Sequence, residues 1–101
     1  MAVKAEDIVC FYLHNSIVIA IDKEGAKYIY DKTLAALENK LNHSFFFRAN
    51  RKYLINIDFV KSFKSYERVK LAVRLLLGIE DFIIISQEKA PFFKKWIYEE
   101  V

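Results

Sequence analysis

Residues 45–63 read FFFRANRKYLINIDFVKSF, and this stretch constrains the fold more than any other part of the chain. Three aromatic residues lead into a polar tripeptide, residues 50–52, and an aliphatic run follows it. Because aromatic and β-branched residues favour strands, the flanks predict two buried strands at residues 45–48 and 53–57. The tripeptide is then a short turn clamped at both ends, which holds its side chains in fixed directions.

The tripeptide combines an amide, a planar guanidinium and a point charge in Asn50, Arg51 and Lys52. The fork of an arginine matches the two acceptors on a guanine edge, the amide of an asparagine matches adenine, and a lysine suits phosphate. The pattern therefore indicates contact with nucleic acid. An alternative stays open, in which Arg51 only forms a salt bridge with Asp58 or Glu67 and Asn50 caps the turn.

Positive charge is concentrated around this turn. The chain has a formal net charge of +3, but residues 48–74 carry eight basic side chains against Asp58 and Glu67. The eight are Arg48, Arg51, Lys52, Lys61, Lys64, Arg68, Lys70 and Arg74. Such a segment is typical of a phosphate-binding surface, and a solvated lysine-rich β-surface is the alternative.

Three short strands are expected upstream. Runs of β-branched and aromatic residues predict them at residues 7–12, 16–21 and 27–30. Gly25 closes the turn before the third strand, because glycine adopts the positive φ that a hairpin turn requires. Cys10 lies in the first run, where we expect a core residue in a reducing cytoplasm.

A helix is predicted over residues 32–42, because three leucines recur at helical spacing and Asp31 or Thr33 can cap its start. We expect the leucines to face the core. They are Leu34, Leu37 and Leu41.

Further strands are predicted downstream at residues 60–65, 68–75 and 82–85, with a turn at Tyr66 and Glu67. In the second of these, the residues expected to face the core are Val69, Leu71, Val73 and Leu75, alternating with Lys70, Ala72 and Arg74. A final helix is predicted at about residues 90–100. Its apolar face is expected to consist of Phe92, Phe93, Trp96 and Ile97, with Pro91 in the first turn.

The 101 residues are thus read as one domain, mainly β with minor α, and they contain few signs of catalysis. There is no glycine-rich phosphate loop, and His14 and His43 lack the spacing of a zinc site. No apolar run approaches the ~20 residues of a membrane span, and the start lacks the apolar stretch of a signal peptide. We expect no catalytic residue, cofactor or metal.

The central motif resembles the signature of the LytTR-type DNA-binding domain. Aromatic, basic, aliphatic and asparagine residues occupy the places of that signature at Phe46, Phe47, Arg48, Asn50, Arg51, Tyr53, Leu54, Ile55, Asn56 and Val60. The likeness extends over residues 6–98, because the upstream hairpin and helix and the downstream Ile85-Ser86 also match.

The resemblance implies an elongated stack of small, mostly antiparallel sheets with a helix. It also implies a cytoplasmic, bacterial function in transcription regulation. The family usually forms the output domain of a two-component response regulator, behind a receiver domain, and reads direct-repeat promoter sites through loops. The implied partner is double-stranded DNA with direct repeats; a homodimer on DNA is compatible with this, and no membrane or small-molecule substrate is expected.

Carried over by position, the resemblance assigns the contacts to three loops. The base-reading candidates are His14, Asn15, Asn50, Arg51, Gln87 and Lys89. The DNA-backbone candidates are Arg48, Lys52, Lys64 and Ser86. By themselves, His14 also fits an ordinary exposed turn residue, and Ser86 also fits a helix N-cap that exposes backbone N–H groups.

Two departures from the family pattern bear on function. Gln87 stands where many members have arginine, and the neighbouring Glu88 repels phosphate unless it turns away. Only residues 1–5 precede Glu6, so the chain is either a fragment lacking an N-terminal strand and a receiver, or a stand-alone module with an exposed sheet edge. Two other functions stay open: an RNA-binding module, and a dimerisation or protein-interaction module without DNA binding.

Overall fold

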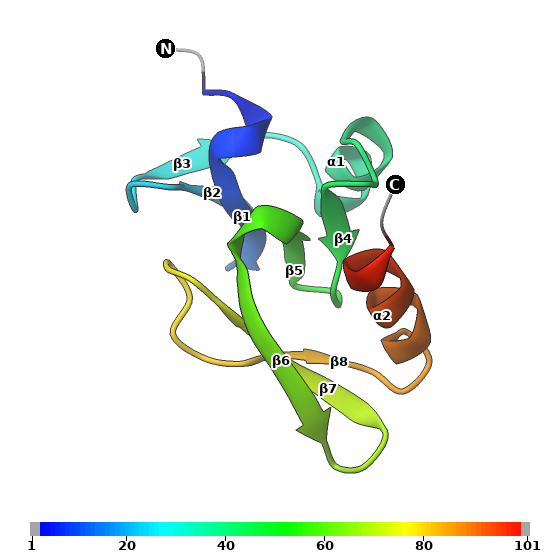
Figure 1. Ribbon diagram of the computed structural model, residues 1–101. Helices are drawn as coiled ribbons and strands as arrows, with labels where there is room; N and C mark the ends of the chain where they lie inside the picture. Colours follow the sequence, from blue (N-terminus) through cyan, green and yellow to red (C-terminus); the bar gives the residue numbers. More distant parts are fainter. Residues whose placement is uncertain (1–2, 100–101) are drawn as a thin grey trace.

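A computed structural model describes residues 3–99, and within that range the chain forms eight strands and two α-helices (Figure 1). The strands are β1 (Ile8–His14), β2 (Ile17–Asp22), β3 (Lys27–Tyr30), β4 (Phe46–Arg48), β5 (Tyr53–Asn56), β6 (Val60–Tyr66), β7 (Lys70–Leu75) and β8 (Ile83–Ile85). The helices are α1 (Leu34–Lys40) and α2 (Ala90–Tyr98), with short 3-10 turns η1 (Ala5–Asp7) and η2 (Ile57–Phe59).

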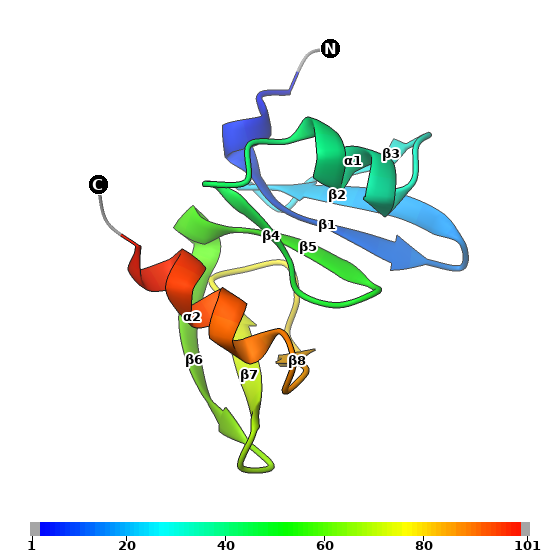
Figure 2. The ribbon, with the colours of Figure 1, turned by 90° about the vertical axis from the view of Figure 1, so that its right-hand side faces the viewer.

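The strands form two antiparallel sheets. The first has five strands in the order β3-β2-β1-β5-β4, and the second has three in the order β6-β7-β8. Figure 2 shows α1 on one side of the five-stranded sheet and the second sheet with α2 on the other. This mainly β, antiparallel architecture confirms the fold class expected from the sequence.

Both faces of the five-stranded sheet pack against a hydrophobic core. An irregularity in the β1–β2 register lies between Ile8 and Cys10, and it interrupts the usual alternation of side chains, so the successive residues Val9 and Cys10 enter the same core. Ile8 and Phe11 pack beneath α1, whereas Val9 and Cys10 join the core between the sheets. The Cys10 side chain is fully buried, as expected, and burial raises the pKa of its thiol to about 12.

Helix α2 covers the core between the sheets and contacts both of them. Phe93 is fully buried, and its ring centroid lies 5.5 Å from that of Phe47 in β4 and 5.1 Å from that of Phe63 in β6. Trp96 also packs on Phe47, with 5.1 Å between ring centroids. The C-terminal segment therefore fixes the position of the segments around β4.

Helix α1 is shorter than predicted. Thr33 is the N-cap, because its Oγ1 accepts a hydrogen bond from Ala36 N (3.0 Å), so the helix begins at Leu34. It ends before Leu41, which has an extended backbone with ψ 157°. Leu34 and Leu37 are buried as expected, and Leu41 is half-buried.

Three other predictions need correction. Phe92 is 66% exposed, because the inward-facing stripe of α2 runs through the buried Phe93 and the half-buried Trp96 and Ile97. Val69 is 48% exposed since it lies in the turn before β7, whereas Ala72 is buried. The last helix ends at Tyr98 rather than near residue 100, which is outside the described residues.

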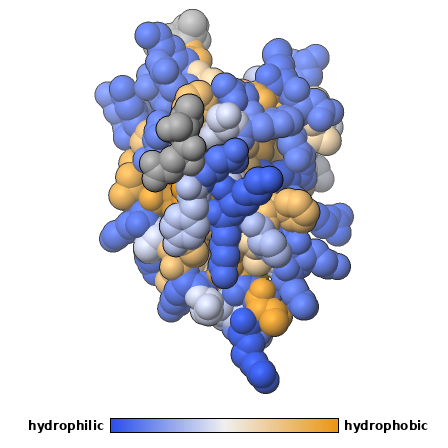
Figure 3. Space-filling view, turned by 45° about the vertical axis from the view of Figure 1, so that its right-hand side comes forward, coloured by the Kyte–Doolittle hydropathy of each residue, from blue (hydrophilic) through white to orange (hydrophobic). Residues whose placement is uncertain are grey.

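One face of the molecule is mostly polar. On the face in Figure 3, hydrophilic residues cover most of the surface and hydrophobic ones form small, separate patches. No helix within residues 3–99 is long and apolar enough to cross a membrane.

Candidate nucleic-acid interface

The loop between β4 and β5 is held from within by Asn50. Its Oδ1 accepts hydrogen bonds from Lys52 N (2.8 Å) and Tyr53 N (3.1 Å), and its Nδ2 donates to Ile84 O in β8 (2.9 Å). The side chain therefore caps the turn, as one reading of the sequence had it, and also ties the loop to the second sheet. Base reading by Asn50 stays a prediction, and it requires some of these bonds to break.

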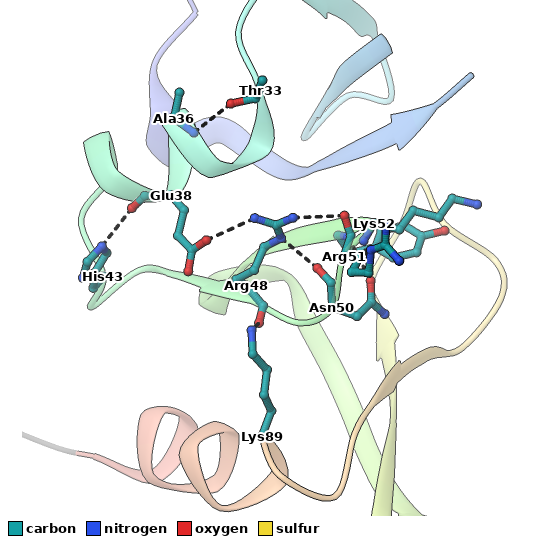
Figure 4. A network of polar contacts seen from close by, with 10 residues as sticks. Thr33, Ala36, Glu38, His43, Arg48, Asn50, Arg51, Lys52 and Lys89 are labelled. Atoms are coloured by element: carbon teal, nitrogen blue, oxygen red, sulfur yellow. Dashed lines mark hydrogen bonds and ion pairs between the residues drawn. The ribbon is translucent and has the colours of Figure 1, made fainter. Parts of the chain in front are cut away.

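Arg48 lies beneath the same loop. Its Nε donates to Asn50 O (2.7 Å), its Nη2 to Arg51 O (3.0 Å) and its Nη1 to Glu38 Oε1 in α1 (3.1 Å). Only 18% of this side chain is exposed, and Figure 4 shows it between Glu38 and the loop. In this structure Arg48 supports the loop, so its predicted phosphate contact needs a different conformation.

Arg51 and Lys52 are the exposed cations of the loop. Neither forms an ion pair with any carboxylate in the described part of the chain, so the alternative pairing of Arg51 with Asp58 or Glu67 is not observed. The Lys52 ammonium lies 5.7 Å from the centroid of the Tyr53 ring, which leaves its charge at the surface. The loop thus presents a guanidinium and an ammonium to solvent.

The β1–β2 turn lies beside this loop, because Leu13 N donates to Lys52 O (2.9 Å). Asn15 and Ser16 have positive φ values of 50° and 67°, which make the connection tight. His14 is exposed, with its Nε2 3.3 Å from Asn15 Nδ2. A groove of about 620 Å³ is lined jointly by Leu13, Ser16, Arg48 and Arg51, together with residues near the start of α1.

The segment from Ser86 to Lys89 forms a third turn, which leads into α2. Ser86 O accepts hydrogen bonds from Lys89 N (3.1 Å) and Ala90 N (2.9 Å). The N-cap position belongs to Lys89, and Ser86 Oγ lies 3.4 Å from its amide as a weaker acceptor. Gln87 and Glu88 are exposed.

Lys89 turns inward, so its ammonium group is not positioned for the predicted base contact in this structure. Its Nζ donates to Arg48 O (2.9 Å) and lies 5.9 Å from the centroid of the Phe47 ring. A second groove, of about 530 Å³, is lined by residues of this turn and of the β4–β5 loop, including Arg51, Ser86 and Glu88. The β4–β5 loop therefore adjoins each of the other two predicted loops, and Arg51 lines both grooves.

Lys64 lies apart from these grooves. It is in β6, lines neither of them, and holds its Nζ 4.7 Å from the centroid of Phe82. Arg74 in β7 stacks on the same ring at 4.3 Å, and its contact was not expected from the sequence. Glu38 was also missed, because only the packing of α1 against β4 brings it to Arg48, and no sequence spacing indicates that.

Comparison with known proteins gives one family and one fold. A family model described as the LytTr DNA-binding domain matches residues 1–98. A similar solved structure is the LytTr DNA-binding domain of a putative methyl-accepting/DNA response regulator from Bacillus cereus. The TM-score is 0.82 at 15% sequence identity, over 97% of this chain and 87% of that chain, so this likeness speaks for the fold alone. No curated protein matches.

Proposed function

The chain belongs to the LytTR family of DNA-binding domains, which is not a family of enzymes, and from that membership we propose that it binds DNA sequence-specifically through three loops. The loops are the β1–β2 turn, the β4–β5 loop and the turn before α2. The single observation that carries the proposal is Arg51, an exposed guanidinium without a carboxylate partner in the described chain, on a loop fastened to β1, β8 and α1.

A fastened loop favours base reading for an energetic reason. A bidentate contact to guanine requires a guanidinium at a set angle, and a loop already ordered loses less entropy when it docks into a groove. The backbone of Arg51 is held by Arg48, and the preceding Asn50 is bonded to β8. We therefore propose that Arg51 reads a guanine and that Lys52 contacts phosphate.

The neighbouring turns supply further contacts in the same proposal. His14 and Asn15 on one side and Gln87 on the other are exposed, so each can reach a base edge. Asn50, Arg48 and Lys89 are engaged inside the protein, and their contribution in this state is to build the surface. Lys64 and Ser86 remain proposed backbone contacts.

The biological setting is proposed on coarser grounds. We place the domain in a bacterial, cytoplasmic transcriptional regulator, as the output domain of a two-component response regulator that recognises direct repeats. The similar structure from Bacillus cereus belongs to a putative methyl-accepting/DNA response regulator, which supports this setting. A receiver domain elsewhere in the full protein and a homodimer on DNA are part of the proposal.

Selection of bound duplexes from a random pool, at two salt concentrations, tests the function. We expect the low-salt and high-salt pools to converge on the same sequence, with guanine at one position opposite Arg51, while total binding falls steeply with salt. A pool that stays random at both salt concentrations would overturn base reading. Stronger retention of single-stranded RNA in a competition, or a stable dimer that binds no nucleic acid, would favour the two other functions.

A further inference from the structure

An acidic residue outside the loops completes their support. Arg48 spans the distance between the β4–β5 loop and Glu38, in the middle of α1, with all three hydrogen bonds at 3.1 Å or less. We propose that Glu38 is a positioning residue for base reading: it holds Arg48 against the loop and so sets the direction of Arg51, without touching DNA. This inference rests on the proposed function.

The reason is the charge of Arg48. Its two bonds to the loop go to neutral carbonyls, of Asn50 and Arg51, and Glu38 is its ion-pair partner in residues 3–99. A cation without that carboxylate is drawn towards phosphate when DNA approaches, because charge-assisted bonds to phosphate are strong. Such a movement releases both carbonyls and with them the backbone that carries Arg51.

Glu38 is itself well anchored. Leu34 and Leu37 bury one side of α1 in the core, so the helix is fixed on the sheet. His43 Nε2 lies 2.8 Å from Glu38 O, and Trp96 Nε1 of α2 donates to His43 O (3.0 Å). The backbone that carries the Glu38 carboxylate is therefore held by α1 and, through His43, by α2. This fixes the end of the support that lies away from the loop.

For Glu38→Gln, the loss of a negative charge and the loss of support for Arg51 have different effects on DNA binding. Glu38→Gln removes a negative charge, which by itself strengthens the attraction of the protein for any DNA. Loss of the support for Arg51 instead weakens selectivity, because it reduces the difference between the affinities for a cognate and a scrambled duplex. The ratio of the two affinities, rather than either affinity, therefore isolates the role of Glu38.

The experiment measures that ratio by titration with the selected duplex and a scrambled one, for wild type, Glu38→Gln and Glu67→Gln. Glu67 is the matched control, because it also forms a surface ion pair, with Lys70 at 3.0 Å in the β6–β7 turn. We expect the ratio to fall about fivefold or more in Glu38→Gln and to stay unchanged in Glu67→Gln. In an Arg48→Gln background, Glu38→Gln should reduce the ratio no further.

A measurement without DNA separates this inference from the function. The amides of Lys52 and Tyr53 bond to Asn50 Oδ1, and we expect their hydrogen exchange to be faster in Glu38→Gln than in wild type. Unchanged exchange and an unchanged ratio in a selective protein would overturn the role of Glu38 alone. A wild type that selects no duplex would overturn the proposed function, and the reading role of Glu38 with it.

Discussion

At the scale of single residues, neighbouring side chains of one motif do different work. Arg48, Asn50 and Arg51 lie within four positions, yet Arg48 and Asn50 form hydrogen bonds inside the protein while the Arg51 side chain faces solvent. Asn56, also in the motif, is 1% exposed and donates through Nδ2 to Ile8 O (2.8 Å). Polar residues at such positions are therefore as much part of the scaffold as of the surface.

Arg51 and Lys52 are expected to differ in what they contribute to binding. Arg51→Ala should weaken the selected duplex by ~1–3 kcal/mol and relax the preference at one base pair. Lys52→Ala should weaken all duplexes about equally and lower the slope of log K against log salt by ~1. Titrations at several salt concentrations measure both. If Arg51→Ala binds the selected duplex like wild type, Arg51 is not the reader.

Because of Cys10, we expect the stability of the protein to fall at alkaline pH. Because burial raises the folded-state pKa to about 12, the unfolded thiol ionises first as the pH rises above its ordinary value of 9.0. The stabilisation is complete below pH ~9 and is lost progressively up to pH ~12. Between pH ~8 and ~10, urea unfolding of wild type should lose about 1.4 kcal/mol more than that of Cys10→Ala. Equal losses would contradict the buried thiol.

At the scale of elements, tight turns position the strands. The turns β1–β2 and β6–β7 both place two non-glycine residues at positive φ, Asn15 and Ser16 in the first, Glu67 and Arg68 in the second. Such turns fit the twist of antiparallel strands, but side chains with a Cβ are strained there. In the first turn the strained residues lie beside the proposed reader, and in the second they lie at the far end of β6.

The β6–β7 turn can therefore be improved without touching the interface. Glu67 and Arg68 have φ values of 49° and 72°, and an Asn-Gly pair adopts this geometry with less strain. The Glu67→Asn, Arg68→Gly variant should gain ~0.5–1.5 kcal/mol in free energy of unfolding, measured with urea. Losing the exposed Glu67–Lys70 ion pair costs little. A loss of stability would show that the strain is already relieved elsewhere.

At the scale of the whole molecule, the two sheets and two helices act as one support. The extents of 42 × 34 × 24 Å describe a slightly elongated body. Residues of all three layers support the β4–β5 loop: Leu13 of the five-stranded sheet and Ile84 of the second sheet bond it directly, and Glu38 of α1 acts through Arg48. The direction of Arg51 therefore depends on how the layers are stacked.

Substitution of Gly78 tests how closely the two sheets pack. Gly78 lies between β7 and β8 with φ 89°, and an added Cβ would lie 3.1 Å from Ile21 Cγ2 in the other sheet. Gly25 has nearly the same φ, 88°, but open space around it, so it is the matched control. Both changes to alanine should cost ~1–2 kcal/mol for the backbone, and Gly78→Ala about 1 kcal/mol more for the contact between sheets. Equal losses in urea unfolding would contradict a close fit there.

Local sequence patterns were sufficient to predict much of the fold and the exposed loop that carries the proposed reader, Arg51. Alternating apolar residues predicted the strands, Gly25 and Thr33 marked a turn and a helix start, and the motif around Arg51 indicated the family. These features depend on residues a few positions apart, so the chain determines them by itself. The exposure of Phe92 and Val69 was missed because neighbouring layers decide which residues at an element's edge are covered.

Only the tertiary structure decided which polar side chains face outward. The sequence predicted base contacts for Asn50, Arg51 and Lys89 and a DNA-backbone contact for Arg48, and it did not distinguish which of these side chains face solvent. Three of them turn inward, and each has a partner that is distant in sequence: Glu38 for Arg48, Ile84 for Asn50, and Arg48 itself for Lys89. Hydrogen bonds of this kind exist only after sheets and helices have packed, so no local pattern can indicate them.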